Sequence, residues 1–173
     1  SIVVPLCFLA IFGLLYMALG GLARAAAVFL AVPLGLAGGV YTLWLTGISF
    51  SVSAAVGFIC LAGVAVLNGL VVMTAIRERL EAGVELSAAI IGGCREKMRA
   101  VVMTGFVPAI GFVPMALAHG TGAEVQKPLA TVVIGGLIAA TILTLLVLPA
   151  IAKVVLGWGE RMGRRGSKQQ DSE

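Results

Sequence analysis

Residues 129–152 read LATVVIGGLIAATILTLLVLPAIA and contain no Asp, Glu, Lys, Arg or His. An α-helix needs about 20 apolar residues to cross the hydrocarbon layer of a membrane. The run is continuous rather than alternating, which favours a helix over a barrel strand. It therefore predicts a transmembrane helix, and with it a membrane protein.

The composition of the whole chain agrees with a membrane protein. Of the 173 residues, 60% are hydrophobic and 12% are charged, and the mean hydropathy is +1.11, whereas soluble domains carry roughly 25% charged residues. A bilayer is therefore the expected solvent for most of the chain. Further uncharged apolar runs predict four more spans, at residues 2–20, 25–45, 54–76 and 100–118.

The five runs predict an all-α membrane protein with one transmembrane helix bundle over residues 1–155. The basic tail over 156–173 is predicted to be disordered and held near anionic head groups by its charge. Between the third and fourth spans, residues 77–99 break at Gly83 and then become apolar at intervals. This pattern predicts a short helix along the cytoplasmic membrane surface.

The basic residues predict the orientation. Eleven of the twelve Lys and Arg residues lie on one side of the predicted membrane, and only Lys127 lies on the other. Because basic loops stay in the cytoplasm, the 77–99 loop and the C-terminus are predicted to be cytoplasmic. Ser1 then begins on the outer side without a Met or a signal-peptide pattern, so we expect the C-terminal part of a longer multi-pass protein.

Two polar side chains are notable inside the predicted spans. Asn68 lies in the third span, and Thr104 lies near the cytoplasmic end of the fourth. An amide in hydrocarbon is costly unless it is hydrogen-bonded, so Asn68 is expected to face another helix or a hydrated path. A threonine hydroxyl can bond to its own helix backbone. Either residue can therefore be structural or part of an ion or proton pathway.

Small residues and prolines predict how the helices pack and bend. Small residues four apart let helix backbones approach closely in lipid. The predicted packing positions are Gly35, Gly39, Gly63, Gly69, Gly135 and Gly136. The sequence GFVP occurs twice in the fourth span, so Pro108 and Pro114 are predicted to kink or locally unwind it, either as a hinge or as irregular packing.

The sequence shows no resident metal site and no cofactor motif. His119 and Glu124 lie five apart on the outer loop without a second His or Cys nearby. The Met residues are scattered and the three Cys residues form no C-x-x-C pair. The basic tail carries no pattern for reading bases, so nucleic-acid binding is not expected.

Three stretches resemble one family of membrane transporters. They are SFSVSAAVGFICLAGVAVLNGLVV at 49–72, MRAVVMTGFVPAIGFVPMAL at 98–117 and TGAEVQKPLATVVIGGLIAATILTLLVLPA at 121–150. Residues 1–155 resemble the C-terminal membrane half of an inner-membrane pump of the resistance-nodulation-division superfamily, in its heavy-metal efflux branch. The most specific part is GAEVQKPLATVVIGGL, where multidrug relatives carry a Gly-Ser-Asn-type sequence.

The resemblance implies a fold, a location and partners. The five spans would correspond to the last five of twelve transmembrane helices in the bacterial inner (cytoplasmic) membrane. The protein would be a proton/cation antiporter, and therefore a secondary active transporter rather than an enzyme. Its partners would be the N-terminal half of the pump, two further copies in a homotrimer, a periplasmic adaptor and an outer-membrane channel, with metal cations and protons as cargo.

Departures from the family pattern bear on the metal and on the proton pathway. Leu67 and Val101 are apolar where some relatives, including copper-type members, carry ionisable residues, which favours a zinc, cobalt or cadmium type over copper or silver. Asn68 and Thr104 match polar positions of the family, but the acidic residues of proton coupling belong to the N-terminal half. Two alternatives remain: a non-transporting fragment or split half that only packs with a partner chain, and a portion of a multidrug efflux pump.

Overall fold

The computed structural model describes residues 2–170, with side chains over 2–161, and it is all-helical there, as predicted. The helices are α1 (Val3–Leu19), α2 (Leu22–Thr46), α3 (Val52–Glu81), α4 (Leu86–Ala116) and α5 (Ala123–Gln170). Helices α2 to α5 are long and apolar enough to cross a membrane, whereas α1 is a shorter apolar helix of 17 residues. The sequence therefore predicted the all-helical class and the order of the elements, while the membrane crossing of its first predicted span stays a prediction.

Glycines end the first two helices. Gly20 and Gly47 have φ values of 63° and 65°, a left-handed conformation that glycine adopts without a steric penalty. The N–H of Gly20 donates to the carbonyl of Tyr16. After the second turn, the Ser51 hydroxyl accepts from the N–H of Ala54 at 3.3 Å and so caps the start of α3.

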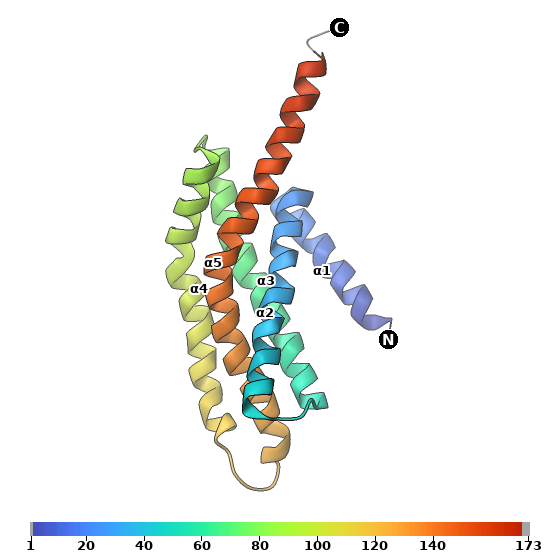
Figure 1. The fold of residues 1–173 in the computed structure, drawn as a ribbon, viewed down its shortest axis with the longest axis vertical. Helices are drawn as coiled ribbons and strands as arrows, with labels where there is room; N and C mark the ends of the chain where they lie inside the picture. The colour runs from blue at the N-terminus through green and yellow to red at the C-terminus, as the bar shows by residue number, and fades with distance from the viewer. Residues whose placement is uncertain (1, 171–173) are drawn as a thin grey trace.

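Helix α5 is the centre of the bundle. Helices α2, α3 and α4 all pack against it, and α2 makes the most extensive contact (Figure 1). Among the described residues, helix α1 contacts only α2 and α3, and it diverges from the bundle toward its N-terminus. Figure 1 also shows that the last part of α5 extends beyond the ends of the other helices.

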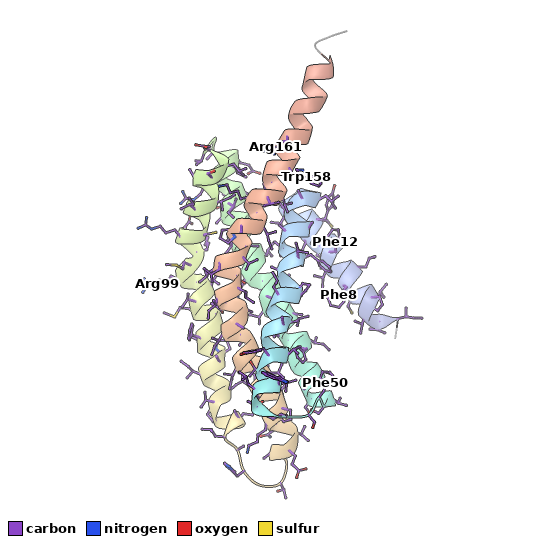
Figure 2. The ribbon with its side chains drawn as sticks, in the orientation of Figure 1. Phe8, Phe12, Phe50, Arg99, Trp158 and Arg161 are labelled. Carbon is purple, nitrogen blue, oxygen red and sulfur yellow. The ribbon has the colours of Figure 1, made fainter. Side chains whose placement is uncertain are left out.

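Aromatic contacts attach α1 to the bundle. The rings of Phe8 and Phe12, labelled in Figure 2, meet the ring of Phe29 on α2 edge to face, with centroids 6.0 and 5.6 Å apart. This geometry is favourable because the positive edge of one ring meets the negative face of the other. Leu15 and Leu19 are buried near the C-terminal end of α1. The helix is therefore held along one side and at one end.

Small residues bring α2 and α5 together. A Cβ added to Gly38 would collide with the Cβ of Ala139, and one added to Gly35 would lie 3.3 Å from the Cβ of Ala140. Lipid provides no hydrophobic drive between helices, so this close approach gains van der Waals contact that larger side chains would prevent. The small-residue pairs of the second and fifth spans thus face each other.

Most of the other predicted packing glycines also lie at helix contacts. An added Cβ would come under 3.0 Å from a side chain of another helix at Gly39, Gly69, Gly135 and Gly136. Gly63 differs, because an added Cβ there would meet nothing within 4 Å. It borders an apolar cavity of about 370 Å³ between α1, α2 and α3.

Helix α4 continues through both of its prolines. The helix includes Pro108 and Pro114 without interruption, so local unwinding is not seen, and the alternative, a kink at these residues, stays a prediction. A proline removes one backbone hydrogen bond, which a helix of 31 residues can lose and remain helical. The hinge role of these two residues stays a prediction.

The predicted surface helix between the third and fourth spans is not a separate element. From Leu86 onward its residues form the first turns of α4, and only a short turn separates them from α3. Ala89 and Ile90 are buried, and Gly93 lies directly against Ile76 of α3. The apolar side chains of this segment therefore pack on the bundle rather than on a membrane surface.

The tail also differs from its prediction. Helix α5 continues to Gln170, where the sequence predicts disorder from residue 156. Extending a helix that already exists costs little, because only the first turn requires nucleation. Residues 171–173 lie outside the described residues.

The contact between Gly38 and Ala139 can be tested by substitution. Gly38→Ala is expected to lower the stability of the protein by about 1–3 kcal/mol, because overpacked helices must separate. Gly38→Ala combined with Ala139→Gly is expected to restore it. The apparent melting temperature in detergent is the measurement.

Gly159→Ala is the matched control, because nothing lies within 4 Å of an added Cβ there. It is expected to leave the stability unchanged or to raise it by up to about 1 kcal/mol through helix propensity. Equal effects of Gly38→Ala and Gly159→Ala would show that α2 and α5 are not in close contact.

Candidate functional site

Most of the charged side chains lie at one end of the bundle, whereas Glu124 and Lys127, at the start of α5, lie at the other. Two arginines bind carbonyl groups at the C-terminal end of α1: Arg24 donates to Leu19 at 3.0 Å, and Arg77 of α3 donates to Ala18 at 3.0 Å. Helix C-termini have unpaired carbonyls and a partial negative charge, so these cations are well placed. They attach the turn between α1 and α2 to α3.

An ion pair joins α3 and α4 at the same end. Arg79 donates to Glu96 at 3.1 Å, and the Lys97 ammonium lies 3.3 Å from the same carboxylate. The pKa of Glu96 is lowered below its ordinary value, chiefly by the hydrogen bond from Arg79 and to a smaller extent by the contact with Lys97. These groups are partly exposed, so they contribute little to stability and mainly mark the polar end of the bundle.

Asn68 is buried inside the bundle. Its side chain is 3% exposed, and its Nδ2 atom has no hydrogen-bond partner among the described residues. Asn68 therefore faces other helices of this chain, as the sequence predicted for an amide within a span. An unpaired amide donor in a low-dielectric core is costly, so the environment of Asn68 is chemically unusual.

Two threonines of α5 are the other buried polar side chains among the described residues. Thr141 is 1% exposed and Thr144 is 5% exposed. The hydroxyl of Thr141 donates to the carbonyl of Leu137 at 2.7 Å. Sequence reasoning missed both residues, because threonines that bond to their own helix are common in spans and only the neighbouring helices show which ones are buried.

The three buried polar residues lie between two apolar clusters of the core. On α3, α4 and α5, one cluster contributes Val72, Val101 and Leu148, and the other contributes Leu61, Ala109 and Ala140. The positions between them are Asn68 on α3, Gly105 on α4, and Thr141 and Thr144 on α5. We call these four residues the polar layer. Gly105 completes it because an added Cβ there would collide with the Thr141 hydroxyl.

The structure does not bring Thr104 into the polar layer. Thr104 is exposed on α4, and its hydroxyl donates to the carbonyl of Ala100 at 2.8 Å. The two polar residues singled out in the sequence thus have different surroundings, since Asn68 is buried and Thr104 lies on the outer surface of this bundle.

The described residues contain no group of three His, Cys, Asp or Glu side chains that could hold a metal ion. Chemically, the interior offers an amide, two hydroxyls and backbone groups. These can accept or donate hydrogen bonds, but none of them titrates near neutral pH.

Comparisons with known proteins agree with this membrane architecture. The model of the AcrB/AcrD/AcrF family matches residues 1–155. The nickel and cobalt resistance protein CnrA of Cupriavidus metallidurans is 63% identical over 156 residues, which cover 90% of this chain and 14% of that protein. The nickel-cobalt-cadmium resistance protein NccA of Alcaligenes xylosoxydans is 58% identical, covering 97% of this chain and 16% of that protein.

A solved structure shows the same arrangement of helices. A crystal structure of a heavy metal efflux pump matches with a TM-score of 0.82 and 43% identity, covering 90% of this chain and 16% of that one. The chain therefore spans about one-sixth of the length of the relatives that it matches. By the family match over residues 1–155 and by these relatives, the chain belongs to the AcrB/AcrD/AcrF family, in the heavy-metal efflux branch of the resistance-nodulation-division superfamily.

Proposed function

We propose that this chain forms part of the membrane domain of a proton-driven exporter of divalent heavy-metal cations. The observation that carries the proposal is the 63% identity, over nine-tenths of the chain, to a protein named for nickel and cobalt resistance. The structural likeness to a heavy metal efflux pump supports the same function. The proton as driving ion comes from the family resemblance.

The proposed cargo is nickel, cobalt, zinc or cadmium rather than copper or silver. Three of the more similar relatives, which are 63%, 58% and 50% identical, are named for nickel and cobalt, for nickel, cobalt and cadmium, and for cobalt, zinc and cadmium. Leu67 and Val101, where some relatives carry ionisable residues, are apolar in this chain. Val101 is also buried, so a charge at that position would be costly here.

The proton-carrying groups are proposed to belong to other helices of the assembly. The five apolar runs contain no ionisable Asp, Glu, Lys, Arg or His residue. Proton coupling needs a titratable group in the membrane, which this chain would receive from the N-terminal half of the pump. Asn68 and Thr104 are proposed as polar members of the pathway that carry no charge themselves.

The exposed surface supports an assembly with further helices. Large apolar side chains are exposed along α3 and α4, including Ile59, Leu67, Met103 and Ile110. Such a surface fits contact with lipid or with other membrane helices. We propose that the whole protein works in the inner membrane as a homotrimer with a periplasmic adaptor and an outer-membrane channel.

Metal tolerance tests the proposed cargo. The full-length protein, expressed in a metal-sensitive bacterium, is expected to raise tolerance to at least one of nickel, cobalt, zinc and cadmium more than tolerance to copper or silver. Growth inhibition is measured against an empty-vector strain, with and without a protonophore. Unchanged tolerance to all six metals would contradict the assignment, and protection against hydrophobic drugs alone would identify a multidrug pump.

Asn68→Leu tests the role of the buried amide. It is expected to lower metal tolerance while the amount of protein in the membrane stays the same, because the substitution removes a polar group from the proposed pathway. Ile59→Leu, on the exposed face of the same helix, is the control and is expected to keep full tolerance. Full tolerance of Asn68→Leu would assign Asn68 to helix packing only.

The proposed orientation places the charged end of the bundle, the 77–99 segment and the C-terminus in the cytoplasm. Figure 2 shows Arg161 and Trp158 on the part of α5 that leads toward the C-terminus. A fluorescent protein fused after Glu173 is expected to fluoresce, whereas alkaline phosphatase at the same place is expected to be inactive. The reverse result would invert the orientation.

A further inference from the structure

The polar layer contains a donor without a partner. Nδ2 of Asn68 is buried and makes no hydrogen bond within the described residues. Buried amides in folded proteins are nearly always bonded to protein or to ordered water, because an unpaired donor loses its hydration without compensation. Helices α2, α4 and α5 all pack on α3, and the other buried polar side chains among the described residues, Thr141 and Thr144, both belong to α5.

The register of α3 and α5 places Thr144 next to Asn68. Gly57 lies against Val132, and Leu61 lies against Gly136, so facing residues are 75 positions apart. The same offset puts Asn68 level with position 143, one residue before Thr144. Thr144 is buried and its hydroxyl can both donate and accept. It is therefore the nearest polar side chain on α5 by register.

The side chains of the polar layer are small. Gly105, Thr141 and Thr144 occupy positions where the clusters on either side carry residues such as Leu, Val and Ala. The Thr141 hydroxyl already donates to Leu137, which leaves its lone pairs free to accept. A site that is polar and lined by small residues is one where a water molecule can be held.

We propose that the polar layer binds one ordered water molecule, which accepts from Nδ2 of Asn68 and donates to the hydroxyl oxygen of Thr144. The water links α3 to α5 between the two apolar clusters and satisfies the amide. This inference goes beyond the proposed function, because it concerns how the two helices are joined, whatever the transported ion.

A double-mutant cycle tests the link between the two residues. Thr144→Val keeps the volume of the side chain but removes the hydroxyl. It is expected to lower the apparent melting temperature of the full-length protein, because Asn68 and its water lose a partner. In the Asn68→Leu background, Thr144→Val is expected to change the melting temperature little. Equal shifts in the two backgrounds would overturn the proposal.

Two controls isolate the hydroxyl. Thr104→Val removes an exposed threonine hydroxyl that bonds to its own helix, and its effect is expected to be the same with and without Asn68→Leu. Thr144→Ser keeps the hydroxyl and is expected to retain the coupling to Asn68. This variant can be measured even if Thr144→Val does not fold. A coupling between Thr104 and Asn68 of the same size would overturn the assignment to Thr144.

A high-resolution structure of the full-length protein tests the water itself. Density within hydrogen-bond distance of both Asn68 Nδ2 and the Thr144 hydroxyl is the expected result. Direct contact between the side chains of Asn68 and Thr144, or an empty apolar gap between them, would overturn the proposal of a bound water. Both readouts are independent of metal tolerance, so a failure of this inference can be distinguished from a failure of the proposed function.

Discussion

The close approach of α2 and α5 is the constraint on which the rest of the bundle depends. In lipid the apolar side chains gain nothing by leaving one apolar surface for another, so helices associate through shape and polar contacts. Gly38 against Ala139, with Gly35 against Ala140, lets the two backbones meet. Because α5 is then central, α3 and α4 can pack on its other sides, and α1 is left at the edge.

The polar layer interrupts an otherwise apolar core at the place where α3, α4 and α5 meet. Asn68, Thr141 and Thr144 add hydrogen-bonding groups without adding charge, so the layer can join helices but cannot itself carry a proton by titration. A proton-driven pump needs helices that hold its membrane domain together and ionisable groups that bind and release protons. The helices of this chain are proposed to do the first, and the ionisable groups are proposed to lie on neighbouring helices.

Much of the fold could be predicted from local pattern, because the bilayer imposes length and apolar composition on each span. The five apolar runs correspond to the five helices, and the glycines at 35, 39, 135 and 136 lie at helix contacts. The start of α4 and the end of α5 could not be read from hydropathy, since both helices continue past the apolar run into charged sequence. Burial was harder to predict than helix formation. Asn68 and Thr104 are both polar residues within apolar runs, and only the packing of the neighbouring helices makes Asn68 buried and leaves Thr104 exposed. The same applies to Thr141 and Thr144, whose surroundings are set by residues more than thirty positions away.

The central claim is that the apolar spans of this chain contain no proton-coupling group and depend on other helices of a metal exporter for proton coupling. The most direct measurement places the 173-residue chain alone in lipid vesicles, imposes a pH gradient and follows the movement of cobalt ions. The account predicts that the helices insert and that cobalt does not accumulate against its gradient. Accumulation driven by the pH gradient would contradict the claim, because it would require a proton-coupling group within these helices.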